Sequence, residues 1–357
     1  MMDIYIRSSA CISAQHSFAT DSLTGSIVEA QTNRLRVIEP DYANYIEHRA
    51  LRRMSHVIRM GVATAKECLN RAHILMPDAI VVGTAYGCME SSSSFLISMI
   101  EREEDDLSPT AFMQSTHNTV AAQIALMLKC HAHNNTFVHK GFSFESAVLD
   151  AIMLLRDEEA TNVLIGGIDE MTDISFVILE RLGMYKRKPV PGLSLFGSGT
   201  KGTIGGEGAA FFLLSAQPGP DDLARLLGVG MFYKPGETPE ICQMIREFLR
   251  QHRVPLEHID VVLTGKNGDA KGDERYEEVN RALFGHAVRA RYKHLCGEYP
   301  TSTSFALWLA AGILKTGIIP DVLKDNASQR GKPGHVLIYN CYLGSFHTLM
   351  LVSTAGR

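Results

Sequence analysis

DAIVVGTAYG, residues 78–87, is a nearly continuous apolar run that ends in a glycine-rich turn. Such a run is typical of a β-strand whose two faces are both covered, as in a parallel sheet between helices. A second run of the same kind, IDVVLTG at residues 259–265, also leads into a glycine-rich loop. Because each run follows a helical stretch, the pair predicts α/β architecture built from repeated units.

The segments around these two runs alternate in the same way along the chain. NVLIGG at 162–167 and EGAAFFLLS at 207–215 are echoed by HVLIYN at 335–340 and FHTLMLVST at 346–354. Further strands are expected at 3–9 and 135–140, and helices at 50–72, 91–103, 117–129 and 142–156. We therefore expect two similar α/β halves, residues 1–215 and 216–357, linked where AQPGPDD interrupts regular structure.

Composition excludes several classes of function. The 357 residues are 45% apolar and 21% charged, with a net charge of −4, so the chain has no basic field for nucleic acid. We find no apolar stretch of the roughly 18 residues that a membrane span needs, and no signal-peptide pattern at the N-terminus. The seven cysteines are scattered and odd in number, which favours free thiols and a cytoplasmic protein.

Several segments, in the same order along the chain, resemble the β-ketoacyl synthase family. They are LRRMS at 51–55 with ATAKECL at 63–69, VVGTAYG at 81–87, SPTAFMQSTHNTVAAQIA at 108–125, NVLIGGIDE at 162–170, GGEGAA at 205–210, the helix after Lys293, and the NCYLGS loop at 340–345, which contains Gly344 and Ser345. The resemblance implies the thiolase fold, two similar halves stacked in five layers, αβαβα. It implies no cofactor and no metal.

The chemistry of that family needs a cysteine at a strand-to-helix elbow and two histidines. The cysteine accepts an acyl chain from a carrier protein, and the histidines stabilise the enolate formed when malonyl-carrier loses carbon dioxide. Aligned without gaps, the three positions in this chain hold Gly141, Gly265 and Glu298. By this alignment no residue takes a catalytic role, because glycine offers neither a nucleophile nor a proton donor.

Other residues near these positions were weighed as substitutes. Ser143, within GFSFE, would be a nucleophile only if Glu298 or Lys293 acted as its base. Glu298 is otherwise a structural acid paired with Lys293. Cys296 is either a reactive thiol near the pocket or a buried, inert one. The group Cys130, His131, His133 and His139 fits no common zinc spacing, so we expect no metal there.

A synthase-like chain without its triad resembles the chain-length factors. The resemblance implies pairing with an active ketosynthase, or with a second copy, and work with an acyl carrier protein in a type II polyketide, polyene or fatty-acid pathway. The family dimerises along the strand before the elbow, here residues 136–140, and residues 110–117 then reach into the partner's acyl pocket. Phe112 and Met113 are thus candidate tunnel stops; the alternative is that both fill the core.

Two other classes of function remain open on the sequence. One is an active condensing or acyl-transfer enzyme with atypical groups, such as Ser143 with Glu298. The other is a subunit that binds a carrier protein or an acyl-coenzyme A without any catalytic partner. Mixing the protein with a ketosynthase separates the partner subunit from the binding subunit, and acylation of the isolated chain supports the enzyme.

Overall fold

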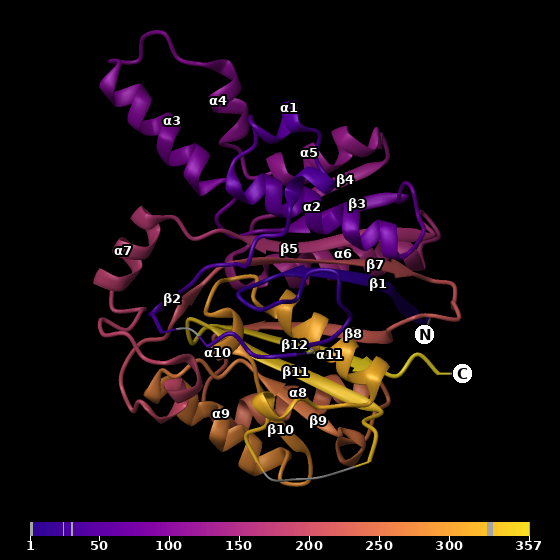
Figure 1. Ribbon diagram of the computed structural model, residues 1–357. Helices are drawn as coiled ribbons and strands as arrows, with labels where there is room; N and C mark the ends of the chain where they lie inside the picture. Colours follow the sequence, from indigo (N-terminus) through magenta and orange to yellow (C-terminus); the bar gives the residue numbers. More distant parts are fainter. Residues whose placement is uncertain (1–2, 24, 30, 327–330, 357) are drawn as a thin grey trace.

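The computed structural model describes residues 3–23, 25–29, 31–326 and 331–356. A ten-stranded sheet runs through the molecule (Figure 1), and its two ends repeat one topology. In the first half the order is β1-β7-β5-β3-β4, and in the second it is β8-β12-β11-β9-β10. If the five strands of each half are numbered by their order in the chain, both halves have the same spatial order, 1-5-4-2-3. The predicted internal repeat is therefore present in the sheet.

The strands of the first half are β1 (Ile4–Ile12), β3 (Ala79–Gly83), β4 (His133–Phe137), β5 (Asn162–Asp169) and β7 (Gly208–Ser215). Those of the second half are β8 (Ala224–Tyr233), β9 (Val261–Thr264), β10 (Val288–Arg291), β11 (His335–Tyr342) and β12 (Phe346–Ser353). A separate small sheet pairs β2 (Arg34–Leu35) with β6 (Gly205–Gly206). The two halves meet where β1 pairs antiparallel with β8, from Ile4 opposite Leu226 to Ile6 opposite Ala224.

Three apolar clusters separate the layers. The central cluster contains α6 (Ser143–Arg156) and α11 (Thr303–Thr316), which lie between strands of both halves. One outer cluster holds α2 (His56–Arg71) and α5 (Thr119–Leu128) against the first half, and the other holds α8 (Thr238–Gln251) and α9 (Ala270–Leu283) against the second. This is the predicted αβαβα thiolase fold. Because the central cluster draws on both halves, the boundary at residue 215 stays a prediction as a division into domains.

The burial of each helix follows its sequence. Twelve of the fourteen residues of α11 are buried, since the segment is apolar on every side and sits in the middle layer. In α8 the buried residues are Ile241, Cys242, Ile245, Phe248 and Leu249, which recur at helical spacing on one face. A helix that is apolar all round therefore occupies the centre, and a one-sided helix covers the outside.

The predicted continuous helix over residues 50–72 is wrong. A short helix α1 (His48–Leu51) ends, and α2 begins only at His56. Ser55 occupies the N-cap position of α2 with an extended backbone (φ −67°, ψ 167°), a conformation that serine favours before a helix. Strands β8 and β10 were also missed: Gly228 and Gly230 interrupt the apolar residues of β8, and β10 has only four residues, of which two are arginines.

One pair of helices projects from the body of the molecule (Figure 1). It consists of α3 (Met89–Glu101) and α4 (Pro109–Gln114), and we call it the arm. The rings of Phe95 and Phe112 join the two helices, with their centroids 5.5 Å apart. Several of its apolar residues are nonetheless exposed: Leu96, Ile97, Ile100, Phe112 and Met113.

Among the described residues, every helix of the molecule is too short or too polar to cross a membrane.

We expect Gly83→Ala to destabilise the fold through the contact of β3 with α6. A methyl group on Gly83 would lie 2.3 Å from the backbone oxygen of Ser143, so the helix would have to move. Overpacking of this kind costs about 1–3 kcal/mol or more. The midpoint of urea unfolding measures the loss. Gly285→Ala is the matched control, because a methyl group there meets no atom within 4 Å; equal effects of the two substitutions would contradict the prediction.

Candidate functional site

The strand-to-helix elbow is closed by aromatic side chains. The chain leaves β4, turns at Lys140 with a left-handed backbone (φ 51°) and enters α6. Gly141 lies buried in this turn, and a Cβ there would be 2.8 Å from Cβ of Tyr342 and 2.9 Å from Cβ of Phe346. Phe142 also packs edge-on against Phe346, with centroids 5.0 Å apart. The direction in which a side chain at 141 would point is therefore occupied by the β11–β12 hairpin.

The second of the aligned positions is closed in the same manner. Gly265 directly follows β9, and a Cβ there would be 2.1 Å from Oδ1 of Asn340 and 2.9 Å from the hydroxyl of Tyr276. Asn340 is buried on β11, where its Oδ1 accepts a hydrogen bond from the hydroxyl of Tyr292 at 3.3 Å. The space beside Gly265 thus belongs to the side chain of Asn340.

The third position carries a buried ion pair. Nζ of Lys293 lies 2.5 Å from Oε1 of Glu298, and their side chains are 0% and 5% exposed. Nδ2 of Asn267 donates to Oε2 of Glu298 at 2.7 Å, so both carboxylate oxygens have partners. Lys293 begins the short helix α10 (Lys293–Cys296). The pairing expected from the sequence is present, and charges held this way are more often structural than free for proton transfer.

The substitutes weighed on the sequence are not assembled into a catalytic group. Oγ of Ser143 accepts from the backbone N–H of His139 and donates to the carbonyl of Lys140, each at 2.8 Å, and neither Glu298 nor Lys293 is its partner. Cys296 is fully buried, and this burial raises the pKa of its thiol well above the ordinary value. No metal-binding group of three acidic, histidine or cysteine side chains occurs in the described part of the chain.

Glu145 was missed by the sequence analysis. It lies one helical turn after Gly141 in α6, is fully buried, and neither of its carboxyl oxygens has a hydrogen-bond partner among the described residues. Burial raises the pKa of this carboxyl to about 7, and nearby Thr303, Thr348 and the charge of Lys293 act in the opposite direction. Because α6 also carries Ser146, Asp150 and Arg156, its sequence did not single out Glu145 as a buried acid.

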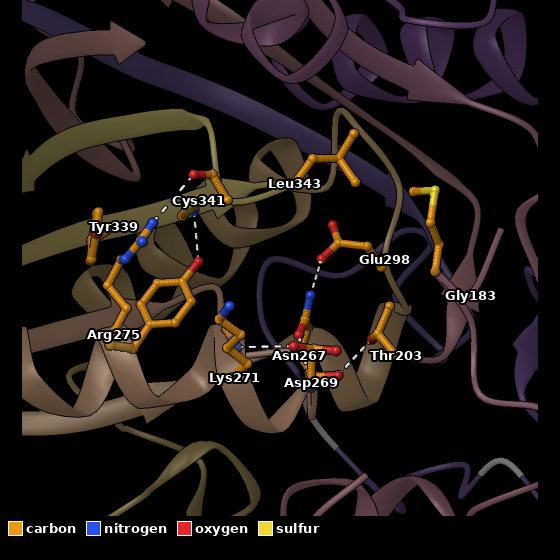
Figure 2. Close-up of a pocket in the computed structure, with 14 residues that line it drawn as sticks. Gly183, Thr203, Asn267, Asp269, Lys271, Arg275, Glu298, Tyr339, Cys341 and Leu343 are labelled. Atoms are coloured by element: carbon orange, nitrogen blue, oxygen red, sulfur yellow. Dashed lines mark hydrogen bonds between the residues drawn. The ribbon is translucent and has the colours of Figure 1, made fainter. Parts of the chain in front are cut away.

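A cavity of about 330 Å³ opens between α9 and the end of β11 (Figure 2). Its walls are formed by the loop before α9, the first turns of that helix and the β11–β12 hairpin, and they include Asn267, Lys271, Arg275, Glu298 and Cys341. Gly344 lines it at the hairpin turn, and the neighbouring Ser345 donates its backbone N–H to the carbonyl of Tyr342 at 3.2 Å. Gly141 does not line this cavity.

The predicted tunnel residues lie elsewhere, on the arm. Phe112 and Met113 are 57% and 61% exposed, so the alternative that both fill the core of this chain is wrong. The strand that was predicted at 135–140 lies earlier, as β4 at His133–Phe137, so only 136 and 137 of the predicted dimer segment 136–140 belong to a strand. β4 is the last strand of the sheet, and among the described residues its outer side is unpaired. Both features leave surface available to another molecule.

Removal of one member of the buried ion pair should be far more damaging than removal of both. Lys293→Met leaves Glu298 charged and buried, which costs about 3–5 kcal/mol, whereas Lys293→Met with Glu298→Leu should recover most of that loss. Chemical denaturation of Lys293→Met, of Glu298→Leu and of the double variant gives the double-mutant cycle. As a control, Arg250→Met breaks an exposed pair with Glu247 and should change little. Equal losses in the single and double variants would contradict a coupled pair.

With this geometry established, the chain can be compared with known proteins. Residues 33–181 match the β-ketoacyl synthase N-terminal domain family. No curated protein matches the chain significantly. Among solved structures the chain is similar to the ishigamide ketosynthase/chain length factor, with a TM-score of 0.79 and 16% identity over 99% of this chain and 100% of that one.

Two further structures give the same result. The first is AntDE:AntF, described as a type II polyketide synthase acyl-carrier protein in complex with its ketosynthase (TM-score 0.76, 14% identity, 99% of each chain). The second is the ketosynthase ApeO in complex with its chain length factor ApeC from Xenorhabdus doucetiae (TM-score 0.74, 15% identity, 99% of this chain and 98% of that one). The chain therefore has the thiolase fold of these structures, and its residues 33–181 are similar to the N-terminal domain of β-ketoacyl synthases.

Proposed function

We propose that this protein is a non-condensing subunit of chain-length-factor type, which pairs with an active ketosynthase in a type II polyketide, polyene or fatty-acid pathway. The observation that carries the proposal is the closed elbow. A nucleophile at position 141 would collide with Tyr342 and Phe346, and Gly141 itself supplies no reactive group. Since Asn340 fills the space beside Gly265 and Glu298 is tied to Lys293, the neighbouring positions supply no imidazole either.

The exposed surface supports an association with another subunit. The arm displays Leu96, Ile97, Ile100, Phe112 and Met113, and the region around the edge strand and α6 displays Val138, Leu149 and Met153. Scattered apolar residues are ordinary on a surface, but concentrations of this kind are typical of protein contacts. An unpaired edge strand beside them would be an aggregation hazard unless a partner covered it. The proposed partner supplies the catalytic cysteine, and this chain supplies contact surface and pocket wall.

The other classes of function have weaker support. The acyl-transfer enzyme built on Ser143 lacks its base, because Glu298 is engaged by Lys293 and Asn267. A subunit that only binds a carrier protein would leave the apolar arm without a role. The solved relatives include complexes of a ketosynthase with a chain length factor and with an acyl-carrier protein, and we extend both kinds of partner to this chain as part of the proposal. A cytoplasmic location and the lack of a cofactor stay predictions from the sequence.

The isolated protein should neither decarboxylate malonyl-carrier nor condense it with an acyl primer. The expectation rests on the glycines at 141 and 265, which carry no functional group. Catalysis is tested by comparing the consumption of radiolabelled malonyl-carrier by the pure chain with that in a protein-free sample. Association is tested by light scattering, with and without a candidate ketosynthase. Turnover well above the protein-free sample would contradict the proposal, as would a chain that stays monomeric in both conditions.

If the arm enters the acyl pocket of the partner, its apolar tip should limit product length. Phe112→Ala and Met113→Ala remove exposed apolar volume from the arm, so the reconstituted complex should release longer products. Each additional buried methylene is worth roughly 0.8 kcal/mol, which is enough to shift a chain-length distribution. Mass spectrometry of the products decides the matter.

Leu75→Ala serves as the matched control, because Leu75 is also an exposed apolar residue but follows α2 and does not belong to the arm. It should leave product length unchanged. An unchanged distribution in both arm variants, with the complex still assembled, would show that the arm does not set chain length.

A further inference from the structure

Cys341 differs from every other cysteine of the chain. The other six thiols are buried, whereas Cys341 is partly exposed and lines the 330 Å³ cavity. It stands near the end of β11, one residue before Tyr342, and its backbone N–H donates to the hydroxyl of Tyr276 at 2.6 Å. Because side chains alternate along a strand, Cys341 faces α9 while Tyr342 faces the elbow. The thiol is thus directed to the opposite side of the strand from the closed position 141.

A histidine lies in hydrogen-bonding contact with this thiol. Cys341 and His347 are directly opposite each other across the β11–β12 hairpin, and Sγ is 3.2 Å from Nε2. The other ring nitrogen, Nδ1, is 3.0 Å from the hydroxyl of Tyr339. The imidazole is also stacked between the rings of Phe232 and Tyr339, with centroids 5.2 and 5.9 Å away. A nucleophile, a base and a group that orients the base are therefore in line.

The protonation states fit a neutral pair. Burial raises the pKa of the Cys341 thiol to about 11, against the effect of Arg275, and burial together with Arg275 lowers the pKa of His347 to about 4. Near neutral pH the thiol keeps its proton and the imidazole is unprotonated, and because the pKa of the imidazole lies far below that of the thiol, the proton can pass to His347 only as Sγ attacks the carbonyl carbon. The titratable and charged groups that face the pair from neighbouring elements are Arg275 and Tyr276 on α9, Tyr339 on β11, Cys242 on α8, and Lys293 and Glu298 around α10.

The cavity that exposes the thiol is lined by two cations and two carboxylates: Asp269 accepts hydrogen bonds from the backbone N–H groups of Gly202 and Gly272, and Glu298 is paired with Lys293, so the two cations are the charged groups left for a ligand. Lys271 and Arg275 stand one turn apart on α9 and both line the wall (Figure 2). Arg275 donates to the carbonyl of Gly344 at 3.3 Å, and among the described residues neither cation is held in an ion pair with a carboxylate. Leu343 and Met184 add apolar surface to the same wall. A ligand that combines a thioester with a phosphate or another anion matches this lining.

We propose that Cys341 is an acyl acceptor, which takes an acyl group from a phosphate-bearing thioester with His347 as the base. In this step His347 removes the thiol proton, Sγ bonds to the carbonyl carbon, and the bond from that carbon to the donor sulfur breaks. The departing thiolate receives the proton from His347. One thioester and one thiol are consumed and one of each is formed, so the step needs no oxidant and no cofactor. Tyr339 is a positioning residue that holds the imidazole.

This mechanism predicts a particular pH dependence. A thiol that reacts through its free thiolate accelerates about tenfold for each pH unit below its pKa. When the proton passes inside the Cys341–His347 pair, neither group titrates between the two pKa values, about 4 and about 11, so the rate of acylation should be nearly flat from pH 5 to pH 9. Loss of the base should bring back the slope.

The experiment incubates the full-length protein, without any ketosynthase, with hexanoyl-coenzyme A, hexanoyl-carrier protein or hexanoyl-N-acetylcysteamine. Peptide mass spectrometry should find a hydroxylamine-sensitive hexanoyl adduct on Cys341, formed faster from the two phosphate-bearing donors. Cys341→Ser should abolish the adduct, and Cys296→Ser, at a buried thiol, should leave it unchanged. The relative rates with coenzyme A and with the carrier distinguish the two sources of the same thioester.

His347→Gln should slow the reaction at pH 7 at least tenfold and restore a rate that climbs with pH, while Tyr339→Phe, which keeps the stacked ring, should have a smaller effect of the same kind. Thermal melting checks that each variant is folded. The proposal is overturned if no donor acylates Cys341, or if a folded His347→Gln protein reacts with unchanged rate and pH slope. Because no partner is present, failure here leaves the proposed subunit role standing, and failure of that role leaves this result standing. An adduct on Ser143 in place of Cys341 would overturn this proposal and would support the acyl-transfer enzyme instead.

Discussion

The contact of the β11–β12 hairpin with the start of α6 determines the chemistry open to this protein. Tyr342 and Phe346 approach Gly141 so closely that position 141 tolerates no side chain without movement of the hairpin. The contact also joins the two halves, since α6 belongs to the first and the hairpin to the second. A single packing arrangement therefore holds the halves together and closes position 141, which the sequence alignment matches to the cysteine of the β-ketoacyl synthases.

The same strand explains why one face is closed and the other open. Tyr342 and Asn340 point toward the centre of the molecule, where the first closes the elbow and the second fills the space beside Gly265. Tyr339 and Cys341 point toward α9, where the cavity lies. Since alternation along a strand is a property of the backbone, the blocked site and the exposed thiol are two consequences of one register. A slip of one residue would exchange them.

Charge buried in the central layer sets a second constraint. Lys293 and Glu298 compensate each other within hydrogen-bonding distance, but Glu145 has no hydrogen-bond partner among the described residues. Burial favours the protonated form of Glu145, with a pKa of about 7, and this limits the penalty of placing a carboxyl between the two halves of the sheet. The interior around Gly141 and Glu298 thus limits the cost of buried charge in two ways, by an ion pair and by a protonated carboxyl.

The sequence predicted the fold because the deciding strands are continuous apolar runs, and β3, β5 and β9 are buried at every residue but one. It missed β8, in which Gly228 and Gly230 weaken the strand signal, and the break at Ser55, which only the local backbone reveals. The spacing of Lys293 and Glu298 was enough to predict their ion pair. Cys341 and His347 were not connected, because their contact depends on the tight turn at Leu343 and Gly344, both with positive φ, which places residues six apart directly opposite each other.

The exposed arm and the closed elbow both bear on which partner would suit this chain. A chain that exposes Phe112 and Met113 so fully keeps apolar surface in water, which is unfavourable unless a partner covers it. A second copy would cover it but would add another closed elbow, so such a pair would hold no cysteine at the family's position. A ketosynthase with an intact elbow would both cover the arm and supply that cysteine. The unlike pair therefore satisfies the surface and the chemistry together, whereas the pair of like chains satisfies only the surface.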